Sequence, residues 1–206
     1  MKNNRIEMWI GHISLAVILT GQLFLAACTS EEGPELEEPK EYYLKFKVGE
    51  VEKKYTALPN SIASFYYLKD FEIYGSTITV IKDINQATKD IVSIQLINET
   101  HFEQNQVYIL QDPVIAQSIS RSRIIFSYFD ENGEGYNALL LKDSYPTLEI
   151  NDEAELKFTE ITDSYVKGTF WARVNAVEFT TLAGRKELLI TEGEFFLPKQ
   201  EGPNYK

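Results

Sequence analysis

The most regular pattern in this sequence is the alternation of apolar and polar side chains from Tyr165 to Glu178. Residues two positions apart share one face of a β-strand, so this segment predicts one long strand with two different faces. The face that we expect to point inward carries Val166, Gly168, Phe170, Ala172, Val174 and Ala176. Gly184 then supplies a turn residue before a second run, Glu187 to Leu197, and the two runs predict a β-hairpin.

Shorter stretches of the same alternation recur along the chain after residue 42. They comprise residues 44–48, 78–80, 92–96, 148–150 and 156–158. Turn-forming sequences separate them, among them Pro59-Asn60, Asn151-Asp152 and the stretch from Asp130 to Gly135. Short strands at this spacing predict an all-β fold, built as an antiparallel β-sandwich, with a lipocalin-like β-barrel as the alternative.

Two segments are the best candidates for helices, but neither keeps apolar residues three and four positions apart over a dozen residues. Ser61 to Leu68 favours a strand, and Asp112 to Ser120 favours a loop with a short turn. Roughly 165 residues follow position 41, which is long enough to bury a core without disulfides or metals. We therefore expect residues 42–206 to form a single β-sandwich domain.

The N-terminus has the layout of an export signal. Lys2 and Arg5 precede an apolar core that runs from Trp9 to Leu25. This core ends in Leu25-Ala26-Ala27-Cys28, which resembles a bacterial lipobox and contains the only cysteine of the chain. The resemblance implies that residues 1–27 are a lipoprotein signal peptide and that Cys28 becomes an acylated N-terminus, carrying chains such as palmitate.

A single transmembrane helix is the competing interpretation of the same segment, because Trp9 to Ala27 is nearly long enough to cross a bilayer. Polar residues and glycines interrupt the segment and weaken this interpretation. Thr29, rather than an aspartate, follows the cysteine. By resemblance to the sorting rules of Gram-negative lipoproteins, this residue favours the outer membrane over the inner one.

Residues 28–41 predict an acylated cysteine followed by an acidic, flexible tether. Six glutamates and two prolines lie between Thr29 and Glu41, against the single basic residue Lys40. Such a stretch has too little apolar area to offset its ordering entropy, so we expect an extended linker. Acidic residues after the cysteine also resemble the surface-export signal of Bacteroidetes lipoproteins, which favours the cell surface over the periplasmic side.

The charge of the chain excludes one class of partner. Its formal net charge is −11, and the adjacent Lys53-Lys54 pair follows Glu50 and Glu52. Binding to nucleic acid needs a basic patch that contacts phosphates, and the sequence offers none. The expected partners are therefore the membrane, through the lipid on Cys28, and a glycan or an envelope protein.

The C-terminal block resembles a family of uncharacterised Bacteroidetes lipoprotein domains. The matching residues are Gly168-Thr169-Phe170, as in the family's "GTF" strand, and Ile190-Thr191-Glu192-Gly193-Glu194-Phe195, as in its "I-T-x-G-x-F" strand. Leu44 to Val48 is similar to the opening strand of these domains, and Leu156 to Ile161 to the strand before the "GTF" one. The resemblance implies an all-β sandwich with no established activity.

Two further patterns are typical of metal-binding or catalytic sites, and each has a simpler structural interpretation. Asp130 to Gly135 begins like a calcium loop, but the twelfth position is Leu141 instead of a bidentate carboxylate, and the flanking segments are strand-like. This stretch predicts a hairpin turn. His101 is the only histidine after Cys28 and lies in a sequence typical of an exposed loop. We therefore expect no metal site, no cofactor and no catalytic residue.

Trp171 is the most interesting candidate for ligand binding. The alternation places it on the outer face of the long strand together with Tyr165, Lys167 and Arg173. An aromatic ring beside a cation can stack on a sugar or bind a carboxylate, so Trp171, Arg173 and Tyr165 are the predicted ligand-binding residues. The alternative is that the sandwich or a neighbouring loop covers the indole.

Together these features predict an outer-membrane lipoprotein with a non-enzymatic binding or assembly role, in which a glycan or a peptide binds to exposed aromatic residues. A structural protein of the envelope without a small ligand is the second hypothesis, because a strand-rich chain has sheet edges that can pair. A carboxylate-dependent hydrolase is the third, since pairs of acids occur by chance in so acidic a chain.

Overall fold

The computed structural model describes residues 41–56, 61–86, 88–177, 186–202 and 204–205. The predicted signal peptide, Cys28 and residues 28–40 of the tether lie outside the described residues. The strands are β1 (Tyr43–Val48), β2 (Val51–Thr56), β3 (Ile62–Leu68), β4 (Ile73–Ile81), β5 (Ile91–Asn98), β6 (Val107–Ile109), β7 (Val114–Ala116), β8 (Ile119–Arg121), β9 (Ile124–Phe129), β10 (Gly135–Ala138), β11 (Glu153–Ile161), β12 (Tyr165–Ala176) and β13 (Glu187–Glu201). Two short 3₁₀ turns, η1 (Ile84–Gln86) and η2 (Lys142–Ser144), complete the described elements. The prediction of an all-β fold is confirmed.

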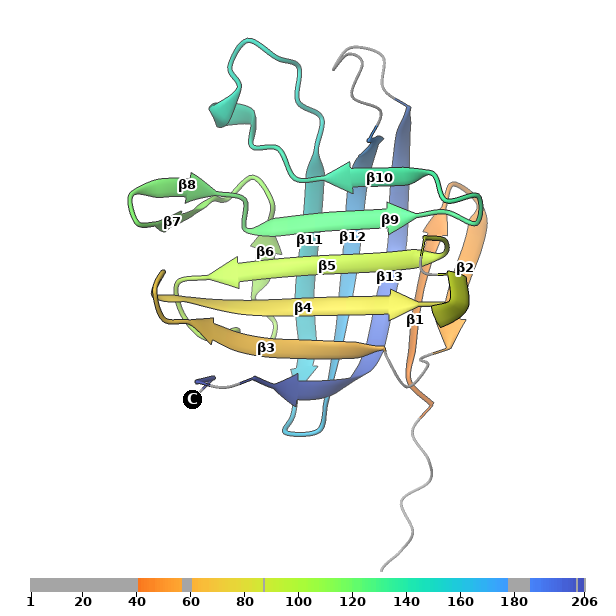
Figure 1. Ribbon diagram of the computed structural model, residues 1–206, viewed down its shortest axis with the longest axis horizontal. Helices are drawn as coiled ribbons and strands as arrows, with labels where there is room; N and C mark the ends of the chain where they lie inside the picture. Colours follow the sequence, from red (N-terminus) through yellow and green to blue (C-terminus); the bar gives the residue numbers. More distant parts are fainter. Residues whose placement is uncertain (1–40, 57–60, 87, 178–185, 203, 206) are drawn as a thin grey trace, which may run out of the picture. The chain divides into compact units, whose positions relative to one another are not determined.

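The strands form two layers that cross each other (Figure 1). β3, β4, β5, β9 and β10 run side by side across the front of the view, and β1, β11, β12 and β13 run behind them in the crosswise direction. Sheets that cross in this way are joined at corners by strands that belong to both layers. In the part of the chain that the structure describes, no helix is long and apolar enough to cross a bilayer.

β13 is the strand that joins the two layers. It pairs antiparallel with β1 on one side and with β12 on the other. Its last residues, Lys199 to Glu201, then pair in parallel with Ala63 to Phe65 of β3 in the front layer. β10 of the front layer also pairs with β12 of the back layer. The series of paired strands from β13 through β3, β4, β5, β9, β10 and β12 therefore closes on itself, because β12 pairs with β13. The molecule is thus a crossed sandwich whose corners close like a barrel.

The core lies between the two layers and follows the predicted alternation over most of each strand. Val166, Phe170, Ala172 and Val174 of β12 are buried, as are most inward residues of β1, β4, β5 and β11. The alternation ends at the last residues of β12, where Asn175 is buried and Ala176 is only half-buried. The strands of residues 41–206 pair only with one another, and these residues form one compact unit. A unit with a complete core of its own is able to fold independently.

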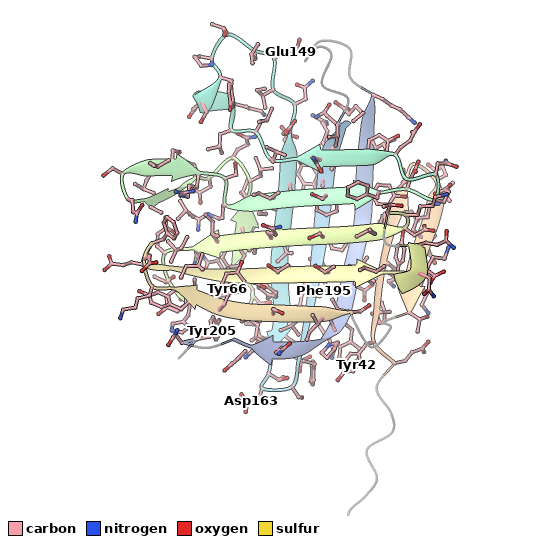
Figure 2. All side chains as sticks on the ribbon, in the orientation of Figure 1. Tyr42, Tyr66, Glu149, Asp163, Phe195 and Tyr205 are labelled. Carbon is pink, nitrogen blue, oxygen red and sulfur yellow. The ribbon has the colours of Figure 1, made fainter. Side chains whose placement is uncertain are left out.

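Two glycine–phenylalanine pairs connect β12 to β13 inside this core. Gly168 lies directly opposite Phe195, and Phe170 lies directly opposite Gly193. The rings of Phe170 and Phe195 stack with their centroids 6.4 Å apart, so each ring covers the glycine of the other strand. A Cβ atom on Gly168 would lie only 2.7 Å from Cε1 of Phe195 (labelled in Figure 2), and one on Gly193 only 2.6 Å from Cε2 of Phe170. The glycines and phenylalanines of the "GTF" and "I-T-x-G-x-F" motifs therefore pack β12 and β13 closely against each other in the core.

A β-bulge interrupts this hairpin next to the glycine pairs. The pairing of β12 with β13 passes from Phe170 opposite Gly193 to Ala172 opposite Ile190, so Thr191 and Glu192 both face Trp171. Glu192 adopts a left-handed backbone conformation with φ of 51°. The pairing of β13 with β1 shifts at the same place, between Lys45 and Lys47. The extra residue bends the strand and re-aims its side chains.

Most of the predicted local structure is confirmed. Residues 62–68 form β3, the two C-terminal runs pair as β12 and β13, and Asp130 to Gly135 forms the turn between β9 and β10. In this turn the Asp130 carboxylate accepts hydrogen bonds from the backbone N–H groups of Asn132 and Glu134. The turn residues Pro59, Asn60 and Gly184 lie outside the described residues.

Two local predictions are wrong. Residues 148–150 are not a strand, because the chain turns there and the Leu148 N–H donates to the carbonyl of Tyr145. The segment from Asp112 to Ser120 is more than a loop, because β7 and β8 pair within it as a short hairpin. Gln117 and Ser118 form its turn with φ angles of 52° and 62°. Neither residue is the asparagine or glycine that usually signals such a turn.

We expect Gly168→Ala and Gly193→Ala to destabilise the fold, each by about 1–3 kcal/mol, because a methyl group at either position overpacks the core between two strands. Chemical denaturation of residues 41–206, followed by circular dichroism, measures the change in the free energy of unfolding. Thr169→Ala is the matched control, since Thr169 lies between the two pairs on the exposed face. An unchanged midpoint for both glycine variants would contradict the packing role.

Burial of tyrosines predicts a loss of stability in alkaline solution. Removal from water raises the pKa of Tyr55 and Tyr128 above the ordinary value of 10.0, and it raises the pKa of Tyr205 to about 12. The unfolded chain releases these protons first, so stability is intact below pH 10 and is lost as the pH rises through the folded-state pKa values. Tyrosinate absorbance should therefore rise in two phases, the second together with unfolding. A single phase near pH 10 in a folded protein would contradict this expectation.

Candidate functional site

The three predicted ligand-binding residues share the outer face of β12, as expected from the alternation. Tyr165, Trp171 and Arg173 are half-buried, while their neighbours Val166 and Ala172 on the opposite face are fully buried. This outer face belongs to the back layer of Figure 1, where β12 lies between β11 and β13. The structure therefore presents the indole of Trp171 on a partly exposed sheet surface.

Trp171 lies in a groove of about 370 Å³ that follows the bulge. On one side its register partner is Glu155 of β11, and on the other side it faces Thr191 and Glu192. The residues that line the groove are Glu155, Thr169, Phe170, Trp171, Glu192, Gly193 and Glu194. The lining of the groove thus combines one indole with three carboxylates.

Two of the three carboxylates are held in place by cations of β1. Lys45 Nζ lies 2.7 Å from Glu194, and Lys47 Nζ lies 2.9 Å from Glu192. The Tyr43 hydroxyl also donates to Glu194 at 2.8 Å. Hydrogen bonds from Lys45 and then Tyr43 hold the pKa of Glu194 below its ordinary value. Glu194 is therefore an anionic hydrogen-bond acceptor with a fixed position.

Glu155 differs from the other two carboxylates. It is half-buried, and no hydrogen bond or ion pair joins its side chain to another residue in the described part of the chain. Its two oxygens are thus available to donors from a ligand. In the described part of the chain, no three acidic or histidine side chains converge as metal ligands do. The groove therefore combines an aromatic surface with dispersed acceptors.

Arg173 lies two residues beyond Trp171 but does not line the groove. Its guanidinium lies 3.3 Å from a carboxylate oxygen of Glu153 and 3.5 Å from one of Glu187. The second contact is an ion pair only, because the geometry at Nε is not that of a hydrogen bond. Arg173 therefore links β11, β12 and β13 at the end of the groove.

Tyr165 belongs to a different cluster at the other end of β12. It lies six positions before Trp171, which corresponds to roughly 20 Å along a strand. Its ring packs edge-on against Phe196 at 5.2 Å, and its hydroxyl donates to Glu160 at 2.5 Å. Lys167 completes the cluster through an ion pair with Glu160 at 2.7 Å. The three predicted residues thus lie on one face of β12, but they do not form one site.

Sequence reasoning missed the acidic walls of the groove. Glu155, Glu192 and Glu194 come from two strands whose register relative to Trp171 depends on the bulge. The one available signal was Gly193 inside a strand, because a glycine there often marks a bulge or a close approach of backbones. His101, which sequence reasoning placed in an exposed loop, lies in such a loop, where its ring packs 4.0 Å from that of Tyr74.

Comparison with known proteins adds no relative to this description. No protein-family model matches the chain, and no curated protein or solved structure is significantly similar to it. The resemblance to Bacteroidetes lipoprotein domains therefore stays a prediction. What the structure adds is a physical reason for the residues that carry this resemblance, because they pack the hairpin of β12 and β13.

Proposed function

We propose that this chain is a non-enzymatic binding lipoprotein, anchored to the outer membrane through Cys28, and that its β-domain binds a neutral glycan in the groove around Trp171. The observation that carries this proposal is a half-buried indole in an open groove, framed by Glu155, Glu192 and Glu194. Trp171 is also the only tryptophan after the predicted signal peptide.

The chemistry of the groove fits a sugar. The electron-rich face of an indole attracts the weakly positive C–H groups on the face of a pyranose ring. The hydroxyl groups around that ring are donors, and carboxylates accept charge-assisted hydrogen bonds from them. The three carboxylates outnumber the two lysines that pair with them, so the groove favours a neutral glycan over an anionic one.

The electrostatics of the groove favour binding over hydrolysis. A glycosidase needs one carboxylic acid with a raised pKa that can protonate the leaving group. The pKa of Glu194 moves in the opposite direction because Lys45 and Tyr43 stabilise its anion. Glu192 is likewise paired with the ammonium group of Lys47. Both groups are thus suited to accept hydrogen bonds rather than to donate a proton.

The edges of the large sheet favour a second candidate function, in which the domain is a structural protein of the envelope. β2 and β6 are the terminal strands of this sheet. They carry exposed apolar side chains, with Val51 58%, Val107 45% and Ile109 44% exposed. A strand from a partner protein can pair with such an edge and bury these side chains. Crosslinking in cells that recovers no protein partner would count against this candidate.

The proposed location of the protein at the outer membrane rests on the N-terminal sequence. Leu25-Ala26-Ala27-Cys28 supports acylation, and Thr29 supports transfer to the outer membrane. The glutamates that follow support display at the cell surface, which would place the groove in contact with external glycans. A protein held on the periplasmic side would instead meet the glycans of the cell wall.

Glycan binding can be followed through Trp171 itself, because residues 41–206 contain no other tryptophan. We expect a neutral oligosaccharide selected on a glycan array to shift or quench the fluorescence of this domain. Trp171→Ala should weaken binding on the array by about tenfold or more, since truncation of a central aromatic anchor typically costs over 1 kcal/mol.

Tyr165→Ala is the matched control for this experiment. It removes an aromatic side chain from the same face of the same strand, at a place outside the groove. Binding should therefore be retained in this variant. Equal loss in both variants would assign the effect to the fold, and an array without any signal for the wild-type domain would contradict the proposal.

The lipid anchor predicts a clear effect of Cys28→Ser in cells. Without the thiol no acyl chain can be attached, so labelling with a palmitate analogue should disappear. The membrane fraction should also lose the mature protein. Thr29→Ser is the control, because it changes the neighbouring residue and keeps the cysteine. A serine variant that is still processed and still sediments with membranes would contradict the anchor.

A further inference from the structure

A second cavity lies on the outer face of the front layer, remote from the Trp171 groove. It is a cleft of about 380 Å³ between the exposed surface of β3, β4, β5 and β9 and the β7–β8 hairpin. In Figure 1 this hairpin stands at one end of β5 and β9. The volume falls within the range of roughly 300–1,000 Å³ that small-molecule sites occupy.

The walls of the cleft are apolar although they face solvent. Leu68, Ile97, Ile125 and Leu139 line it, and both Leu68 and Ile125 are 37% exposed. The outer face of an antiparallel sheet is usually polar, so contiguous apolar side chains there indicate a surface that is covered for part of the time. Tyr66, labelled in Figure 2, adds its ring to this surface.

The hairpin that forms one wall is fixed in place by a small core of its own. Val114 and Ala116 of β7 are buried against Ile73 of β4, and Phe71 and Ile97 pack against them. This cluster is separate from the main core. The hairpin wall of the cleft is therefore packed onto the sheet, and the apolar lining of the cleft continues into this second core.

One cation at the cleft, Arg121, has neither a side-chain hydrogen bond nor an ion pair with any described residue. The guanidinium of Arg121 stacks 5.0 Å above the ring of Phe71, and its Nε is buried without a hydrogen bond. Among the described residues, no carboxylate lies within ion-pair distance of this guanidinium. Nε has no surface that a ligand could reach, but no described residue accepts a hydrogen bond from the Nη groups either, so an anionic ligand could accept charge-assisted hydrogen bonds from them.

Arg123 shows the contrast, because it also reaches the cleft but is fully paired. Its Nε donates to the carbonyl of Asp112 at 2.9 Å, and Nη2 lies 3.3 Å from the carboxylate of the same residue. Its Nη1 donates to Asn98 and, at 3.1 Å, to Glu99. Arg123 therefore anchors the surrounding loops, and Arg121 is the cation available to a ligand.

We propose that this cleft binds a single-chain amphiphilic carboxylate, such as a free fatty acid. The alkyl chain would lie against Leu68, Ile97 and Ile125, and the carboxylate would pair with the guanidinium of Arg121. An apolar wall with one unpaired guanidinium selects this combination, because the fork of an arginine binds a carboxylate through two charge-assisted hydrogen bonds. The inference does not depend on glycan binding, since the two sites lie on different layers.

The test is calorimetric titration of residues 41–206 with dodecanoate below its micelle concentration. We expect saturable binding at one site. Dodecyltrimethylammonium, which has the same alkyl chain and a positive head group, should not bind. Absence of heat with millimolar dodecanoate, or equal binding of the cationic amphiphile, would overturn the proposal.

Variants separate the head-group contact from a general change of fold. Arg121→Gln should weaken dodecanoate binding by about tenfold or more, because it removes the charge and keeps a donor. Ile125→Glu should abolish binding by placing a like charge at a partly exposed position in the cleft. Arg173→Gln, on the other layer, is the matched control and should bind as the wild type does. Unchanged affinity in Arg121→Gln, with an unchanged unfolding temperature, would overturn the assignment of the carboxylate to Arg121.

Discussion

The contact between glycine and phenylalanine across β12 and β13 is the constraint on which the structure depends. At Gly168 and Gly193 the absence of a Cβ atom allows the opposite ring to lie flat on the backbone, and the two rings stack on each other. β12 and β13 form the centre of the back layer, and each also joins that layer to the front one. The bulge that creates the Trp171 groove lies directly beside these pairs, so core packing and groove geometry are coupled.

The alternation of side chains made the strand faces predictable, because burial follows the same period as the sequence. It allowed most inward residues of β1, β4, β5, β11 and β12 to be predicted correctly. It failed at residues 148–150, where the Leu148 N–H takes part in a local turn, although equally short stretches at 78–80 and 156–158 do form strands. It also failed at β7 and β8. Gln117 and Ser118 form the turn with positive φ angles, and glutamine and serine are not residue types that predict such a turn.

The candidate sites were less predictable than the fold because they depend on which strands become neighbours. Trp171 could be placed on an outer face from its own strand, but Glu155 and Glu192 reach it through a register that only the folded sheet defines. The second cleft needs four strands and a hairpin from distant parts of the chain. The parallel pairing of β3 with the end of β13 had no local signal either, since it joins residues far apart in sequence.

The two outer faces differ in the chemistry that they offer. The back layer carries an indole with carboxylates whose charges are partly balanced by Lys45 and Lys47. The front layer carries aliphatic side chains with one unpaired guanidinium. A polar, hydroxyl-rich ligand suits the first face and an amphiphile suits the second. The two proposed sites share no lining residue, although one sheet carries both.

The parallel pairing at the end of β13 also fixes which contact closes the molecule. β13 is the last strand of the described chain, and its residues Lys199 to Glu201 pair with β3 of the front layer. Without β13, β3 lacks one neighbour, and β1 and β12 lack the strand between them. Detachment of this one strand would therefore open both layers at once, so the local stabilities of the front and back layers are coupled through it.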